Sequence, residues 1–143
     1  MVINQLSVFL ENKPGRLAAV LETLAQNDVD ISSLNLAEAS DYGVLRLIVS
    51  DPDKGQKALT ESGVVVRITQ MVAIAVDDTP GGAARVAKVL SQNNIEIEYM
   101  YACIGMADGK ALMVCRVQNV ARAEQVLEEY GMNAHKLKEI YRI

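Results

Sequence analysis

Hydrophobic and polar residues follow two different periods along the start of the chain. Leu6, Val8 and Leu10 alternate with other residues, which is typical of a strand with one buried face. The period then changes to that of an amphipathic helix, whose apolar face comprises Leu17, Val20, Leu21 and Leu24. The chain therefore passes from strand to helix at the intervening Pro14 and Gly15.

The rest of the first half predicts two strands, a helix and a final strand. The pattern is extended over 29–39 and again through VLRLIV, and the Asp and Gly residues within 41–43 suit a hairpin turn. A helix over 53–62 is expected to end at Gly63, before the strand VVVRI. The predicted order of elements is βαββαβ.

The second half repeats this order. It reads as the strand MVAIAV, a helix over 80–92, the strand IEIEYMYACI, the strand ALMVCRV, a helix over 119–130 and a strand within 134–142. Residues 14–50 align on 80–116 without a gap, and the identical pairs are Pro14/Pro80, Gly15/Gly81, Ala18/Ala84, Val20/Val86, Leu24/Leu90, Gln26/Gln92, Asn27/Asn93, Ile31/Ile97 and Gly43/Gly109. A duplication explains this pattern best.

The two halves predict an α+β fold of two ferredoxin-like units, residues 1–68 and 69–143. Each would hold a four-stranded antiparallel sheet with two helices on one face. A unit of about 70 residues buries its core only marginally, so we expect the two to pack together. No Gly, Pro, Asn or Asp interrupts 64–76. This leaves two possibilities open: nearly continuous strands across the boundary, or exchange of a terminal strand between the halves.

Composition narrows the classes of function. The chain has 143 residues and a net charge of −4, and neither half is basic, which argues against binding to nucleic acid or to an anionic membrane. It has no apolar run of spanning length and no signal-peptide pattern, so we expect a cytoplasmic protein. Cys103 and Cys115 do not form a CxxC pair, and we interpret them as buried packing groups.

The Pro-Gly sequence marks both helix entrances. Asn12 or Asp78 is expected to cap the helix through its side-chain oxygen, with the proline in the first helical turn. Gly15 and Gly81 then remove a side chain from the place where unpaired N–H groups point outward, so a small carboxylate could dock there. The alternative is that Pro-Gly only turns the chain.

These residues resemble a known family. ENKPGRL followed by NDVDI, and DDTPGGA followed by NNIEI, are similar to the pattern of the ACT domain, the small-molecule regulatory module of amino-acid metabolism. The resemblance covers nearly the whole chain and implies a stand-alone tandem pair. It further implies that an amino acid binds at an interface between units, within the chain or in a homodimer, and that an enzyme partner responds.

The resemblance also implies ligand-binding positions. By analogy with family members of the serine-biosynthetic dehydrogenase type, the contacts come from the loop before the helix and from the opening of the second strand. These positions are Asn12, Gly15, Arg16, Leu17, Asp30 and Ile31 in the first half, and Asp78, Gly81, Gly82, Ala83 and Glu96 in the second.

The chain departs from that type of ACT domain at charged positions. Asp30 and Glu96 replace an asparagine, so they would suit the ammonium group of a ligand and not its carboxylate. Asp78 would repel a ligand carboxylate, which favours the first site. The alternative is that Asp30 and Glu96 are solvated charges at strand ends.

Other chemistry finds little support in the sequence. The one histidine, His135, has no obvious Cys or Ser partner, and we interpret it as structural. The phosphate-binding patterns GxxxxGK[ST] and GxGxxG are missing from the sequence. We therefore expect a non-enzymatic amino-acid sensor without metal or cofactor. Two rivals are an interaction or dimerisation scaffold without ligand, and a small ferredoxin-like enzyme.

Overall fold

A computed structural model describes residues 1–37, 40–105 and 109–143. The chain divides into two compact units. The N-terminal unit consists of Asn4–Thr69 together with Arg142 and Ile143, and the C-terminal unit consists of Met1–Ile3 and Gln70–Tyr141. Each unit is described separately below.

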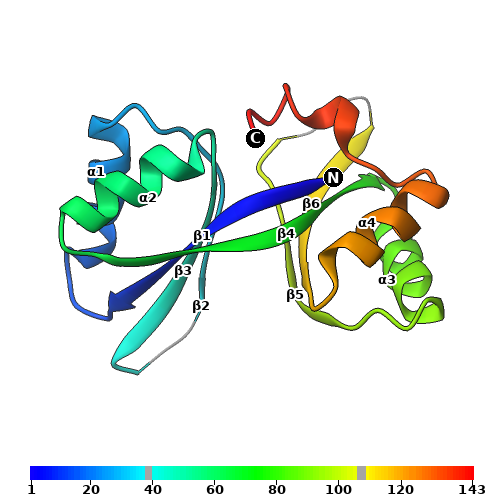
Figure 1. The fold of residues 1–143 in the computed structure, drawn as a ribbon, viewed down its shortest axis with the longest axis horizontal. Coiled ribbons are helices and arrows are strands. Elements are labelled where there is room, and N and C mark those ends of the chain that lie inside the picture. The colour runs from blue at the N-terminus through cyan, green and yellow to red at the C-terminus, as the bar shows by residue number, and fades with distance from the viewer. Residues whose placement is uncertain (38–39, 106–108) are drawn as a thin grey trace. The chain divides into compact units, whose positions relative to one another are not determined.

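The N-terminal unit contains a sheet with two helices on one of its faces (Figure 1). Its elements are β1 (Val2–Glu11), α1 (Arg16–Gln26), β2 (Ile31–Ala37), β3 (Tyr42–Val49), α2 (Pro52–Glu61) and the start of β4 (Val65–Asp77). β3 pairs antiparallel with both β1 and β2. The apolar stripe of α1 and the alternating residues of β1 meet in one core, as the two sequence periods predict.

The C-terminal unit repeats this arrangement (Figure 1). After β4 come α3 (Gly82–Gln92), β5 (Ile97–Ala102), β6 (Lys110–Val117), α4 (Val120–Glu129) and a short 3-10 helix, η1 (His135–Leu137). β6 pairs antiparallel with β4 and β5. The strand order β2-β3-β1-β4-β6-β5 places β2 and β5 at the two edges and confirms the α+β fold of two βαββαβ units.

The boundary between the halves shows both features that the sequence left open. β4 is a single strand of 13 residues that crosses from one unit into the other. The first residues of β1 belong to the C-terminal unit, where the Ala73 N–H donates to the carbonyl of Met1 at 2.8 Å. The start of the chain thus supplies a strand partner to β4 in the unit formed by the second half.

The prediction of a strand within 134–142 is wrong. Its segment forms η1 followed by turns. An isolated bridge joins Asn133, just before this segment, to Ile74 of β4. Met1 already pairs with β4 at Ala73, so the backbone groups that a further strand would need are partly taken.

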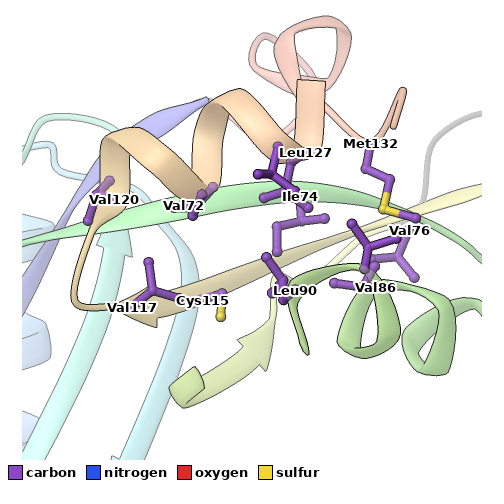
Figure 2. Close-up of a cluster of buried hydrophobic side chains, with 13 residues drawn as sticks. Val72, Ile74, Val76, Val86, Leu90, Cys115, Val117, Val120, Leu127 and Met132 are labelled. Carbon is purple, nitrogen blue, oxygen red and sulfur yellow. The ribbon is translucent and has the colours of Figure 1, made fainter. Parts of the chain in front are cut away.

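Equivalent residues of the two repeats occupy equivalent places in the two cores. Leu24 of α1 and Leu90 of α3 are both fully buried, each in the core of its own unit. In the C-terminal unit, Val72, Ile74 and Val76 of β4 face the two helices, and Cys115 lies beside them (Figure 2). Burial raises the pKa of the Cys115 thiol to about 11. Cys103 and Cys115 are both buried and neither forms a disulfide, as expected for packing groups.

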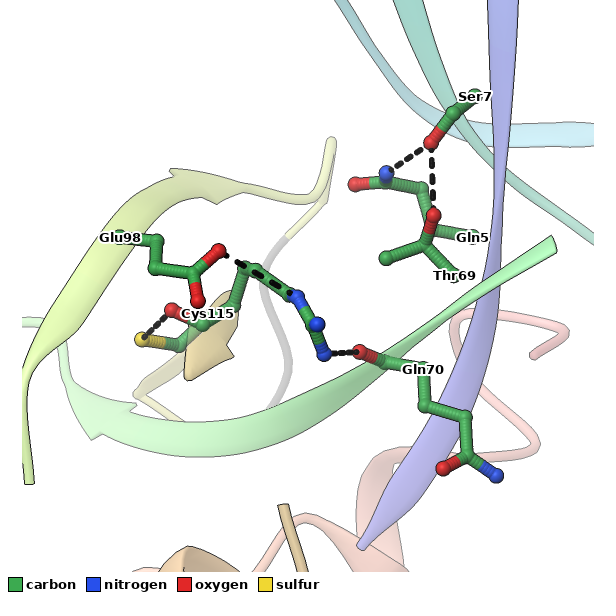
Figure 3. A network of polar contacts seen from close by, with 7 residues as sticks. Gln5, Ser7, Thr69, Gln70, Glu98 and Cys115 are labelled. Atoms are coloured by element: carbon green, nitrogen blue, oxygen red, sulfur yellow. Dashed lines mark hydrogen bonds and ion pairs between the residues drawn. The ribbon is translucent and has the colours of Figure 1, made fainter. Parts of the chain in front are cut away.

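One group of polar side chains in each unit forms local hydrogen bonds or ion pairs (Figure 3). The buried Gln5 donates from Nε2 to Ser7 Oγ at 2.8 Å, and that hydroxyl lies 2.9 Å from Thr69 Oγ1. In the C-terminal unit, Arg116 pairs with Glu98 at 3.5 Å and donates to the carbonyl of Gln70 at 3.2 Å. Such pairing is the rule for partly buried polar groups, so these contacts need no functional explanation.

Candidate functional site

The two Pro-Gly turns, residues 12–15 and 78–81, start α1 and α3 in the same way. Gly15 and Gly81 are the N-cap residues, with φ of 86° and 93°, values in the left-handed region that favours glycine. Neither helix start receives a side-chain cap. The first N–H of each helix has a backbone acceptor instead: Arg16 donates to the carbonyl of Lys13 at 3.2 Å, and Gly82 donates to that of Thr79 at 3.0 Å.

The prediction that the side chains of Asn12 and Asp78 cap the two helices is wrong. The Asn12 side chain donates to the carbonyl of Ser40 at 3.4 Å, and its backbone N–H donates to Asp41 at 2.8 Å. Asp78 likewise donates its backbone N–H to Gly109 at 2.9 Å. Both residues therefore connect their turn to the neighbouring hairpin. They are too far from the helix start to cap it, because each helix begins after the glycine and not before the proline. The proline precedes the N-cap and lies outside the first helical turn.

An open pocket of about 990 Å³ lies beside the first Pro-Gly turn, entirely within the N-terminal unit. Its walls come from the end of β1, the turn, the start of α1 and the β2–β3 hairpin; they are Leu10, Glu11, Asn12, Lys13, Pro14, Gly15, Leu17, Leu36, Ala37, Ser40 and Gly43. This volume is in the range of pockets that hold small organic molecules. Three of the predicted ligand positions line it: Asn12, Gly15 and Leu17.

A glycine forms part of the pocket wall at the hairpin. Gly43 stands opposite Leu10 in the β1–β3 register. A Cβ at Gly43 would lie 3.2 Å from the carbonyl oxygen of Ala37 and 3.4 Å from Leu36 Cδ1. Glycine at this position therefore allows β2 and Leu36 to approach β3 closely. Leu36 itself is 49% exposed, which is high for a leucine facing the helix side of the sheet.

Three charges lie at the mouth of this pocket. Glu11 Oε2 is 3.3 Å from Lys13 Nζ and 3.3 Å from Arg16 Nη2. The Lys13 ammonium first, and then the Arg16 guanidinium, lower the pKa of Glu11 below its ordinary value, and burial opposes them only in part. Arg16 is thus placed beside the pocket through its ion pair with Glu11, although it does not line the pocket itself.

Asp30 and Ile31, the other predicted positions of the first half, do not line this pocket. The Asp30 carboxylate accepts from the Ile31 N–H at 3.0 Å and pairs with Arg142 at 2.9 Å. Its backbone pairs with Ser50, in both directions, at 3.0 Å. Asp30 therefore anchors the start of β2 to its own surroundings, at the end of α1 away from Gly15.

The second Pro-Gly turn has a different environment. A hollow at the start of α3 measures about 20 Å³, room for about one water molecule. Gly82 lines it together with Tyr130, Gly131 and Met132, so it is not the counterpart of the first pocket, which is walled by a hairpin. Asp77 of β4 forms ion pairs there with Lys110 and with Arg85, the latter at 3.4 Å. Lys110 first, and then Arg85, lower the pKa of Asp77 below its ordinary value, against the effect of burial. Asp78, Gly81, Ala83 and Glu96 are not among the lining residues.

The sequence did not identify two groups of residues near the helix entrances. Glu11 and Asp77 occupy matching places at the ends of β1 and β4, and the acid before each Pro-Gly turn was a usable signal. Leu36 and Gly43 of the hairpin were harder to find, because only strand pairing brings them beside the turn.

Other kinds of site are not supported in the described part of the chain. Among these residues no cluster of three His, Cys, Asp or Glu side chains could hold a metal ion. His135 is an exposed residue of η1. None of the described helices is long and apolar enough to cross a membrane.

Comparisons with known proteins concern the family and the fold of the chain. The profile of the family described as "ACT domain pair" matches residues 1–141. The solved structure of protein BT0572 from Bacteroides thetaiotaomicron is 44% identical, with a TM-score of 0.86, over 93% of this chain and 91% of that chain. No curated protein sequence matches the chain.

Two more distant structures share the fold. The regulatory subunit of aspartate kinase from Thermus thermophilus is 14% identical, with a TM-score of 0.61, over 90% of this chain and 96% of that chain. The corresponding subunit from Thermus flavus is 15% identical, with a TM-score of 0.57, over 90% of this chain and 94% of that one. At these identities the likeness concerns the fold alone.

Proposed function

The chain belongs to the family of ACT domain pairs, and we propose that it is a non-catalytic regulatory protein that binds an amino-acid-type ligand in the pocket beside the first Pro-Gly turn. The proposal includes a cytoplasmic location. It also includes a homodimer or a regulated enzyme as the partner that responds to the ligand. The ligand contacts proposed at the second turn are subordinate to those at the first.

The observation that carries this proposal is the pocket itself. It is large enough for an amino acid with any side chain, and Gly15 holds the helix start open on one of its walls. Two regulatory-subunit structures share the fold, which supports a regulatory role without identifying a ligand.

The proposed mechanism is thermodynamic linkage. A ligand that binds one state of the protein more tightly than another shifts the protein toward that state, and a partner then recognises the favoured state. Such a ligand also stabilises the folded protein, by about 2.7 kcal/mol at 100 times its dissociation constant. For a protein of this size the melting temperature should rise by several degrees.

Thermal melting against all twenty amino acids tests the proposal. A reproducible rise of the melting temperature with at least one of them is expected, and unchanged melting temperatures with all twenty would refute ligand binding of this type.

A sharper version of this experiment uses Gly15→Val with Gly81→Val as its matched control. Both glycines have a positive φ and no neighbouring atom within 4 Å of an added Cβ, so the cost in stability should be similar. Only Gly15→Val should abolish the ligand-induced rise.

A scaffold without ligand is the second candidate, and one observation favours it. Leu34 and Leu36 of the edge strand β2 are 44% and 49% exposed, which is unusual for two leucines on one strand face. Sedimentation at several protein concentrations, with and without the amino-acid mixture, separates the candidates. A scaffold should self-associate equally in both conditions, whereas a sensor should shift its association when ligand is present.

A further inference from the structure

The chemistry of the pocket narrows the class of ligand beyond an amino acid in general. Its walls contain three leucines, Leu10, Leu17 and Leu36, from three different elements. Gly43 also lines the pocket and adds no side chain to it. A ligand with a branched or aromatic hydrocarbon body would bury apolar surface here, whereas a charged side chain would lose hydration without gaining a partner.

The charges at the mouth favour an anion. Lys13 and Arg16 share one carboxylate, that of Glu11, so this group of three charges has an excess of one positive charge. Both cations are largely exposed, at 67% and 59% of their side chains, and can turn toward a bound carboxylate without breaking a buried contact. A ligand carboxylate would complete the balance of two cations and two anions.

The described residues of this pocket offer little to an ammonium group. Among the described residues that line it, Glu11 is the only one with an acidic side chain, and both cations already hold it. Asp30, which the sequence assigned to the ammonium, lies outside the lining and pairs with Arg142. An ammonium near the mouth would also meet the charges of Lys13 and Arg16.

From these observations we infer that the ligand class is the apolar carboxylates, and that the carboxylate and the hydrocarbon body carry recognition while the amino group contributes little. Apolar acids without an amino group should therefore bind about as tightly as the matching amino acids. This inference rests on the proposed function, because it concerns the same pocket.

Isothermal titration at neutral pH with matched ligands tests the inference. Leucine is compared with isocaproate, which lacks the amino group, and with isoamylamine, which lacks the carboxylate. Phenylalanine is compared in the same way with hydrocinnamate and phenethylamine. In the series that binds, the acid should bind within about fivefold of the amino acid, and the amine should be at least roughly tenfold weaker, the loss expected for one charge-assisted contact.

The outcomes separate the two levels of the proposal. An acid more than fivefold weaker than its amino acid overturns the inference and leaves amino-acid binding intact. Lysine or aspartate binding more tightly than both leucine and phenylalanine overturns the apolar class in the same way. No binding by any compound, together with flat melts for all twenty amino acids, refutes the proposed function and the inference with it.

Variants with matched controls locate the interaction. Replacing both Lys13 and Arg16 by glutamine should weaken the acid roughly tenfold. Lys57→Gln removes an exposed cation of α2 and should leave binding unchanged. Glu11→Gln removes the competing anion and should tighten acid binding by about threefold. Unchanged affinity in the double variant, or weaker binding in Glu11→Gln, would contradict the assigned roles.

The apolar wall has its own control on the same strand. Leu36→Gln should weaken the acid roughly fivefold, because the ligand loses apolar contact area. Leu34→Gln changes the neighbouring exposed leucine, which faces the same side of β2 but does not line the pocket. It should leave the affinity unchanged. Equal losses in the two variants would show that the strand, and not the pocket wall, is responsible.

Discussion

The two Pro-Gly turns of the molecule have nearly the same backbone and very different surroundings. Each places a glycine with positive φ at the N-cap of an 11-residue helix. Beside the first turn lies an open pocket of about 990 Å³, and its walls include the β2–β3 hairpin. At the start of α3 the described residues line a hollow of about 20 Å³, whose walls instead include Tyr130, Gly131 and Met132 after α4. The duplicated backbone thus has different neighbours at its two helix starts.

Side chains at equivalent positions account for the difference. Arg16 and Leu17 follow the first turn, whereas Gly82 and Ala83 follow the second. At Gly82 the helix start lies so close to β4 that an added Cβ would overlap the carbonyl oxygen of Asp77. The helix entrance is thus packed directly on the strand in the C-terminal unit. In the N-terminal unit the same position carries a long side chain at the surface.

The largest expected effect tests whether the two units differ only at their entrances. Leu24→Ala and Leu90→Ala remove equivalent, fully buried leucines from the two cores. Each should lower the free energy of unfolding by about 3 kcal/mol, through lost apolar burial and the remaining cavity. Urea unfolding followed by circular dichroism measures both. Losses that differ by more than about 2 kcal/mol would mean that the cores differ as much as the entrances do.

A smaller effect sharpens the difference at the entrances. Gly82→Ala should cost about 2 kcal/mol, because the new methyl group forces the helix start away from Asp77. Arg16→Ala makes the same residue at the equivalent position, where the side chain is exposed, and should change stability by less than about 0.5 kcal/mol. The same urea measurement compares them. Similar costs would contradict the close packing inferred for the second entrance.

The helices and cores of both units follow directly from the spacing of apolar residues. Leu24 and Leu90 were identifiable because a helix face repeats within a few residues, and local periods survive in the folded state. The last strand was not predictable from local sequence. Met1, at the opposite end of the chain, partly takes the position beside β4 that this strand would occupy. A contact between such distant residues leaves no periodic pattern in the local sequence.

The pocket was predictable only in part, for the same reason. Asn12, Gly15 and Leu17 are contiguous with the Pro-Gly pattern, and the sequence placed them together. Leu36 and Gly43 reach the pocket through the pairing of β3 with β1 and β2, which a single sequence does not specify.

The smallest expected effect concerns the acids at the two entrances. Cations lower the pKa of both Glu11 and Asp77 in the folded protein. A carboxyl group whose pKa is lower in the folded state adds stability above its unfolded pKa, and this contribution disappears as the pH falls through the folded value. The melting temperature should therefore decline on acidification below about pH 4, the ordinary range of carboxyl groups.

Single substitutions assign that decline to the two entrances. Glu11→Gln and Asp77→Asn each remove one titrating group, so each should flatten the decline of melting temperature between about pH 4 and pH 2. Both carboxylates are partly exposed, and screening by water keeps each effect small. Glu61→Gln changes an exposed acid of α2 and serves as the control. If Glu61→Gln flattens the decline as much as the other two, the entrance ion pairs have no special part in acid stability, and the entrances differ in packing alone.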